Sequence, residues 1–421
     1  MSERSSFSKY RWFILFVIIP IIISTEMLWL SLAPISSLAE KFYGVSSMNI
    51  TLFSMSYMIM FIIFSLPASW VVDKFGYRYS LIIGASITAV FAIIQAIFAH
   101  DYTIALVSQF MIAIGQPFIL NISTKVPANW FPVSERSTAA GILTMAQYIG
   151  YTVPMLLAPM IAENQGIPNT FMVFAIIASV SALISIIFTR EKPLVAAPGP
   201  IDPKEGLSIK SIRKLFLNKS FLQVLFICFI SMGIFNTLLS LLETILLPRG
   251  ITSAQSGIVG TVFVISGIIG AVVLPVISDK IGKRVPFFVI TIALLIPIYL
   301  GFSLLKSYLI ITILAAIAGF LIMGVAPILF QHGAEVAYPI QEGTSLGFIL
   351  LMGQISGALF VYLFEIIKNS TGSVVWPMLF IVLLTAAELP VTLRMKESDL
   401  LVKNQGWLDS SKQQYQHSTG Y

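Results

Sequence analysis

Twelve long apolar runs dominate this sequence of 421 residues and constrain its fold more than any other feature. Each run is about 20 residues long, the length with which a helix crosses a bilayer. The residues do not alternate between apolar and polar, as strands of a membrane barrel would. In lipid every backbone N–H and C=O group must be paired within the protein, which allows only helices or a closed barrel. With the barrel excluded, the runs are predicted to be helices. The runs cover 12–36, 50–72, 79–99, 103–125, 137–161, 168–189, 220–247, 255–278, 285–304, 307–332, 343–368 and 373–392.

Composition excludes a soluble protein, because only 10% of the residues are charged and 57% are hydrophobic. Soluble domains carry about 25% charged residues. The net charge is +6, but the basic residues lie in the loops expected between membrane spans. We therefore expect no nucleic-acid partner. The single cysteine, Cys228, excludes an intramolecular disulfide. Three scattered histidines show no metal-ligand spacing and no axial pair for haem. We therefore expect neither a metal nor a cofactor.

The basic residues predict the orientation, since Lys and Arg collect in cytoplasmic loops. Twelve spans place both termini on one side. If that side is cytoplasmic, it holds all but four of the 25 Lys and Arg residues. The first run is too long for a signal peptide and has no cleavage site, so we interpret it as a span. We expect a multi-pass integral protein of the plasma membrane with both termini cytoplasmic. The four exceptions are Lys41, Arg249, Lys306 and Lys368.

The two halves of the chain repeat each other at a nearly constant offset. DKFGYR begins at Asp73 and DKIGKR at Asp279, 206 residues later, and FPVSE and YPIQE are 207 residues apart. Gln147 and Gln354 are 207 residues apart, as are Gly150 and Gly357. Such a parallel repeat places a binding site between two halves near the midplane. The expected fold is an all-α membrane protein of twelve transmembrane helices in two six-helix bundles related by a pseudo-two-fold axis. Its predicted parts are an N-terminal bundle (1–189), a cytoplasmic linker (190–219), a C-terminal bundle (220–392) and a cytoplasmic tail (393–421).

The two D-K-x-G-x-R loops lie at equivalent places, between spans 2 and 3 and between spans 8 and 9. Their Asp can meet a helix N-terminus and their basic residues can pair across the cytoplasmic face. We interpret them as a latch for the outward-open state, although a solvated turn is the alternative. The latch residues are Asp73, Lys74, Gly76, Arg78, Asp279, Lys280, Gly282 and Arg284.

The paired loops match the signature of the major facilitator superfamily, which the chain resembles over its whole length. Ser69 stands where that family usually has Gly, which implies a looser helix contact. Segments at 121–139 and 324–357, including E-x-x-Y-P-x-x-E-G-T-S, resemble one branch, the feline leukaemia virus subgroup C receptor-related transporters. Members of that branch move choline and related molecules.

The branch resemblance implies a cage for a quaternary ammonium, made of a Trp in span 1, a Tyr in span 7 and two Gln. Trp29, Gln147 and Gln354 match three of these positions. The internal repeat pairs Trp29 with Asn236, where the family has Tyr. Phe235 is adjacent but points about 100° away on a helix. This departure predicts a different amine preference.

Glu26 is the sharpest physical signal in the first span. It lies roughly 21 Å along the helix axis, where an exposed carboxylate costs at least ~2.5 kcal/mol. Glu26 and Trp29 share a helix face, and a carboxylate beside an indole suits an organic cation. Glu26 could instead bind a coupling proton or make a plain interhelical hydrogen bond.

Other polar residues in the spans carry weaker expectations. Gln116 and Asn121 are interpreted as packing or cavity-lining groups. Tyr148 and Tyr151 could supply a second aromatic wall beside Gln147. Three further carboxylates near span ends are expected to be wetted at the membrane interface: Glu243, Glu365 and Glu388.

No enzyme motif is present: the sequence has no P-loop, no G-x-S-x-G and no H-E-x-x-H. We expect a secondary active or facilitative transporter of a small polar organic solute, an amine or choline-like cation, that works by alternating access. A proton-coupled transporter of an unrelated metabolite and a non-transporting receptor or sensor are the alternatives. The expected partners are the solute and the bilayer, with a coupling proton left open, and the expected state is a monomer.

Overall fold

The computed structural model describes residues 10–131, 133–191, 209–340 and 342–398, and within these ranges twelve helical segments are long and apolar enough to span a membrane. All twelve predicted spans are therefore confirmed as helices. The first half contains α1 (Tyr10–Trp29), η1 (Ala33–Ile35), α2 (Ser36–Tyr43), α3 (Ser47–Phe75), α4 (Tyr77–Ile97), α5 (Tyr102–Leu120), α6 (Ile122–Trp130), α7 (Val133–Gln165) and α8 (Ile167–Phe188). The second half contains α9 (Ile209–Leu217), α10 (Lys219–Leu246), η2 (Leu247–Arg249), α11 (Ser253–Ile281), α12 (Val285–Leu304), α13 (Tyr308–Val336), α14 (Glu342–Thr371) and α15 (Val375–Thr392).

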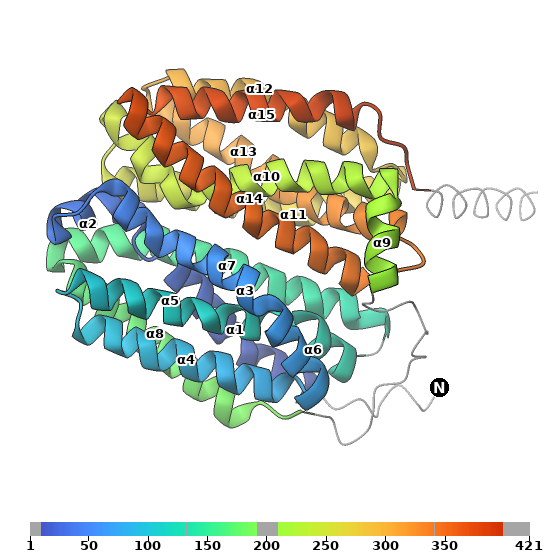
Figure 1. The fold of residues 1–421 in the computed structure, drawn as a ribbon, viewed down its shortest axis with the longest axis horizontal. Helices are drawn as coiled ribbons and strands as arrows, with labels where there is room; N and C mark the ends of the chain where they lie inside the picture. The colour runs from blue at the N-terminus through green and yellow to red at the C-terminus, as the bar shows by residue number, and fades with distance from the viewer. Residues whose placement is uncertain (1–9, 132, 192–208, 341, 399–421) are drawn as a thin grey trace, which may run out of the picture.

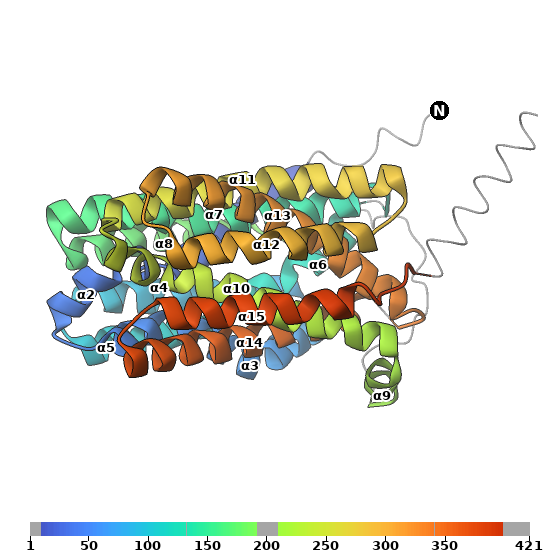
Figure 2. The same cartoon turned by 90° about the horizontal axis from the view of Figure 1, so that it is seen from above.

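The helices gather into two groups that lie side by side, α1–α8 in one and α10–α15 in the other (Figure 1). Seen from above, both groups run along the same long axis (Figure 2). The halves meet where α7 packs on α11 and where α3 packs on α14. At the first border a Cβ on Gly257 would overlap the backbone of Met155. Glycine is thus required there for close helix approach.

The bundle has two ends along its long axis. The two ends of the described chain lie at one of them, the terminal face, and α2 lies at the other, the distal face (Figure 1). The short helix η2 is also at the distal face, since Leu247, Pro248 and Arg249 line one pocket with Ser36 and Ser37 of α2. Most of the predicted linker and tail, at 192–208 and 399–421, lies outside the described residues, as does Pro132 of the repeat.

Spans 1 and 7 are both interrupted near the distal face. Span 1 breaks after Trp29 and resumes through η1, where Pro34 supplies no backbone N–H for a continuous helix. In span 7, Leu241 has non-helical angles (φ −119°, ψ 15°). Pro34 and Leu241 are 207 residues apart, so the two interruptions are equivalent in the repeat. Paired broken helices of this kind border the binding sites of many transporters.

Candidate functional site

An aromatic cluster joins the two halves of the molecule. The Trp29 ring meets the Tyr151 ring edge-on, with centroids 5.4 Å apart. Tyr151 also contacts Tyr148 at 6.0 Å and, across the border between the halves, Phe235 at 6.2 Å. Phe235 in turn contacts Phe263 at 6.2 Å. These five residues, the aromatic cluster, connect α1, α7, α10 and α11 through ring contacts.

Trp29 is held in a fixed orientation inside this cluster. It is the last residue of α1, and its side chain is only 5% exposed. The indole Nε1 donates a hydrogen bond of 3.1 Å to the Ser54 carbonyl of α3. A buried indole N–H needs such a partner. Because the ring is locked by Ser54 and Tyr151, its π system is preorganised.

Phe235 adds a contact that the sequence interpretation did not foresee. The helical offset from Asn236 suggested that its ring points away from the site, yet the ring contacts Tyr151 of the opposite half. The sequence interpretation considered only Asn236, the repeat partner of Trp29. It ignored the approach of α7 toward α10. The suggested role of Tyr151 as an aromatic wall fits this geometry.

Gln147 and Gln354 occupy equivalent places on α7 and α14. Both are half-buried, and neither side chain forms a hydrogen bond with another residue in the described part of the chain. Gln147 shares a helix face with Gly150 and Tyr151, and these two residues contact α1 at Glu26 and Trp29. The two amides therefore retain donors and acceptors that a ligand can use.

Asn236 lies at the matching place in the second half and is 5% exposed. Its Nδ2 donates a hydrogen bond of 3.2 Å to the Gly353 carbonyl of α14. A Cβ on Gly357 would lie 2.5 Å from this nitrogen, so α14 presses closely on Asn236. The side-chain oxygen has no partner within the described ranges, which leaves it free to accept a hydrogen bond.

Glu26 is buried inside the first half, with 1% of its surface exposed. Both carboxylate oxygens accept from Nε2 of Gln116, at 3.3 and 3.2 Å. A Cβ on Gly150 would lie 2.6 Å from the Glu26 Cβ, so α7 packs tightly over it. Gln116, expected to pack or line a cavity, is thus a direct partner of Glu26. Asn121 packs, since its Nδ2 bonds Ser69 Oγ at 3.0 Å.

Glu243 forms a polar cluster across the halves at the distal face. It is fully buried. Its oxygens accept from the hydroxyls of Ser36 and Ser37, both at 2.5 Å, and from Ser253 at 2.6 Å. The Ser37 backbone N–H donates a fourth bond of 3.0 Å. We call Glu243 with these three serines the distal gate.

The gate lies on the pseudo-two-fold axis. Ser36 and Glu243 are 207 residues apart and touch each other. Two positions related by a two-fold operation can be in contact only where the axis passes between them. The sequence prediction that Glu243 is wetted was wrong, although the repeat offset from Ser36 could have indicated this contact.

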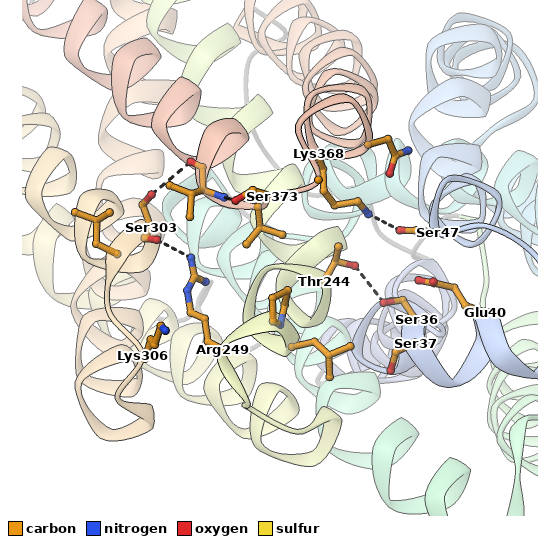
Figure 3. A pocket seen from close by; sticks show the side chains of 17 residues that line it. Ser36, Ser37, Glu40, Ser47, Thr244, Arg249, Ser303, Lys306, Lys368 and Ser373 are labelled. Atoms are coloured by element: carbon orange, nitrogen blue, oxygen red, sulfur yellow. Dashed lines mark hydrogen bonds between the residues drawn. The ribbon is translucent and has the colours of Figure 1, made fainter.

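A second cross-half contact involves Glu365, also expected to be wetted. Glu365 is fully buried, and it accepts from Lys368 Nζ at 2.8 Å and from Ser47 Oγ at 3.1 Å. Lys368 Nζ also donates to Ser47 Oγ at 2.7 Å (Figure 3). The prediction failed because Ser47 of α3 and Lys368 shield this carboxylate from the interface.

Glu388, the third carboxylate expected to be wetted, is also buried, at 1% exposure. Both oxygens accept from Ser231 Oγ at 3.1 Å. The equivalent pair in the first half is Ser24 and Ser181, 207 residues earlier, with hydroxyls 2.9 Å apart. A polar contact between the first and sixth membrane spans of each half, α1 with α8 and α10 with α15, is therefore repeated.

The latch loops make contacts within their own halves. Asp73 pairs with Lys125 at 3.1 Å, and Arg284 pairs with Glu335 at 2.6 Å. The Lys74 ammonium lies 4.7 Å from the ring centre of Trp70. Asp279 and Lys280 are exposed, whereas Arg284 is buried. The loop glycines Gly76 and Gly282 have φ of +94° and +65°.

The helix N-termini next to these loops are capped by different carboxylates from those expected. Glu191 Oε2 accepts from the Arg78 backbone N–H at 2.7 Å, and Glu397 Oε1 accepts from the Arg284 backbone N–H at 3.0 Å. Glu191 and Glu397 are 206 residues apart. In this state, therefore, residues just after spans 6 and 12 take the place at these helix N-termini, where negative charge is favoured. A contact of the loop Asp with a helix N-terminus in the outward-open state stays a prediction.

Comparison with known proteins agrees with this architecture. The sequence profile described as Major Facilitator Superfamily matches residues 6–361. Solute carrier family 49 member A3 of Xenopus tropicalis is 28% identical, over 85% of this chain and 78% of that protein. The choline/ethanolamine transporters FLVCR1 of Felis catus and FLVCR2 of Homo sapiens are 27% and 26% identical, over 85% and 84% of this chain and 68% and 71% of theirs.

A solved structure shares the fold. It is a bacterial homologue of the human lysosomal transporter Spinster, described as inward-facing and unoccupied. The TM-score is 0.73 at 14% sequence identity, covering 91% of this chain and 97% of that one.

Proposed function

The chain belongs to the Major Facilitator Superfamily and is therefore a transporter rather than an enzyme, and from this premise we propose that it moves a small organic amine by alternating access. The observation that carries the proposal is the aromatic cluster joining both halves around Trp29. A cation over an indole face gains up to about 2 kcal/mol when it is desolvated. Relatives named choline/ethanolamine transporters support this substrate class.

The proposed site consists of Trp29, Gln147, Asn236 and Gln354 around the aromatic cluster, with Glu26 behind it. The two free amides of Gln147 and Gln354 supply polar contacts from each half. The buried carboxylate of Glu26 favours a positive charge nearby. A ligand contacting both halves would couple binding to their relative motion.

We propose that the structure represents the state closed at the distal face. Every polar contact between the halves found within the described ranges lies there, at the distal gate and at Ser47 with Lys368. The similar Spinster homologue, described as inward-facing, supports this assignment.

With the positive-inside distribution, we place the termini in the cytoplasm, the distal face outside the cell and the protein in the plasma membrane. The working unit is the pair of bundles 1–189 and 220–392, joined by 190–219 and followed by the tail 393–421.

Uptake into proteoliposomes tests the substrate class. We expect saturable uptake of labelled ethanolamine, and we expect primary or partly substituted amines to compete at least as well as choline. The reason is Asn236, whose free oxygen accepts an N–H hydrogen bond that choline cannot offer. Uptake of neutral polar solutes but no amine would refute the proposal.

The variant Asn236→Tyr sharpens this test. It replaces the acceptor by an aromatic ring, which favours a quaternary ammonium through the cation–π contact. We expect the ratio of choline to ethanolamine uptake to rise about tenfold, which corresponds to roughly 1.4 kcal/mol. Asn121→Ala, which removes a packing amide between α3 and the end of α5, is the control and should leave the ratio unchanged. An unchanged ratio in Asn236→Tyr would remove Asn236 from the site.

A proton-coupled mechanism is the second candidate, favoured by Glu26 alone. A carboxylate in a membrane helix with one neutral amide as its partner is a common proton carrier. The same proteoliposomes, assayed with and without a pH gradient, distinguish the two mechanisms. Uptake driven by the gradient in the wild type and insensitive to it in Glu26→Gln would identify Glu26 as the proton site.

We also propose that the two D-K-x-G-x-R loops latch the opposite state, open at the distal face. In the present state Asp73 pairs only with Lys125 of its own half within the described chain. We expect Asp73→Asn to lower the maximal uptake rate several-fold and to leave the apparent substrate affinity within about twofold, because Asp73 lies at the terminal face, away from the site. An equal loss of affinity in Asp73→Asn and Gln354→Ala would contradict the latch.

A further inference from the structure

A cavity at the distal face lies between the two halves. Its volume is about 640 Å³. The first half contributes Ser36, Ser37, Glu40 and Ser47 to its wall. The second half contributes hydroxyl and basic groups, among them Thr244, Arg249, Ser303, Lys306, Lys368 and Ser373 (Figure 3).

Three of the four basic residues that depart from the positive-inside distribution converge on this cavity. Arg249, Lys306 and Lys368 come from different helices or loops, far apart in the sequence. Lys41, the fourth exception, is exposed on α2 and is not part of the wall. Scattered surface cations would not be expected to gather in one concave site between two halves.

The carboxylates around the cavity balance these cations only in part. Glu365 pairs with Lys368. The carboxylate of Glu243 accepts hydrogen bonds from the serines of the distal gate. Glu40 lines the opposite wall, away from Arg249 and Lys306 (Figure 3).

Two cations on the second-half wall therefore lack an acidic partner in the described ranges. Within the part of the chain that the structure describes, the Arg249 guanidinium donates only to backbone carbonyls, of Ile245 at 2.7 Å and Ser303 at 3.0 Å. These bonds hold its planar fork in place and leave further N–H donors. Lys306 is exposed and forms no hydrogen bond or ion pair with another described residue. A fixed guanidinium beside a free ammonium is a chemical match for an anionic oxygen group.

We propose that this cavity binds a small anionic group, a phosphate or carboxylate, between Arg249 and Lys306. The hydroxyl of Ser373, which accepts from the Val375 N–H, lies on the same wall and can donate its proton to the anion. Because Ser36 and Ser47 of the other half close the cavity, the bound anion contacts both halves. It stabilises the state closed at the distal face and slows transport by opposing its opening. The site acts independently of which solute is carried.

Thermal unfolding of the purified full chain in phosphatidylcholine nanodiscs tests the site. Inorganic phosphate is compared with chloride at equal ionic strength. We expect phosphate to raise Tm by at least about 2 °C through binding to the folded state. Lys306→Gln should weaken the apparent phosphate Kd about tenfold, because it removes one charge-assisted hydrogen bond. Lys306→Arg should restore it, and Lys41→Gln should behave as the wild type.

The source of the anion is distinguished by a second arm. Nanodiscs containing phosphatidic acid are tested without free phosphate. One outcome is that phosphatidic acid raises Tm in the wild type but not in Lys306→Gln, while free phosphate raises Tm in neither. In that case the anion is a lipid headgroup, and the proposed site is supported. If neither source raises Tm, or if Lys306→Gln and Lys41→Gln respond equally, no anion site exists there.

Discussion

Replacing Trp29 by alanine is expected to abolish amine uptake. The indole is buried, fixed by Ser54 and packed against Tyr151. A desolvated cation–π contact is worth about 2 kcal/mol, a loss of roughly 30-fold in affinity. The Tyr151 ring would also lose its edge-on partner, so the contact between α1 and α7 loosens. Together these losses should bring uptake close to that of empty liposomes.

Two further variants make the Trp29 result specific. Trp29→Phe keeps an aromatic face but loses the hydrogen bond to Ser54, so we expect it to retain part of the uptake. Trp376→Ala is the control, since that indole is 58% exposed and should leave uptake unchanged. If Trp29→Ala leaves the uptake of every tested cation unchanged, the aromatic cluster is not a cation site.

The repeating features of the fold were predictable from sequence. Apolar runs near 20 residues have one stable solution in lipid, and all twelve spans are found. The offset of 207 residues between Gln147 and Gln354 also relates the Ser24–Ser181 and Ser231–Glu388 contacts. The length of an apolar run and the repeat offset can be read from the sequence itself. They can therefore be used for prediction without knowledge of tertiary contacts.

The partners of buried polar groups were not predictable in the same way. Glu243 and Glu365 lie near span ends, where exposure to water is the usual outcome. Their burial depends on hydroxyls of Ser36 and Ser47, more than 200 residues away. Span position cannot reveal such partners. The break in span 1 at Pro34, which brings Ser36 to the axis, also lies inside an unbroken apolar run.

Phe235 shows why a helical wheel was insufficient for the site. The wheel describes which side of α10 a residue occupies relative to Asn236. It does not say which neighbouring helix approaches that side. Here Tyr151 of the other half approaches Phe235, so the ring that joins the aromatic cluster comes from a residue beside the repeat position.

Glu243→Ala should open the distal face. The substitution removes four hydrogen bonds that a buried carboxylate accepts, three from serine hydroxyls and one from the Ser37 N–H. Ser36 and Ser37 lie in the first half, and Ser253 in the second. Losing the partner of buried donors costs about 1–3 kcal/mol. The equilibrium between closed and open states should therefore shift about 5- to 150-fold toward opening. Glu243→Gln keeps the shape and an acceptor oxygen, so its shift should be smaller.

Labelling of a buried cysteine measures this opening. Met155 is 1% exposed and packs against Gly257 and Gly260 across the halves, so Met155→Cys becomes reactive only when they separate. Cys228→Ser removes the single native thiol. We expect a hydrophilic maleimide to label Met155→Cys at least about tenfold faster with Glu243→Ala, in line with that shift. Glu388→Gln is the matched control, because Glu388 is similarly buried but its carboxylate, among the described residues, bonds only Ser231 of its own half. Equal labelling rates in Glu243→Ala and Glu388→Gln would mean that Glu243 stabilises the protein without holding its halves together.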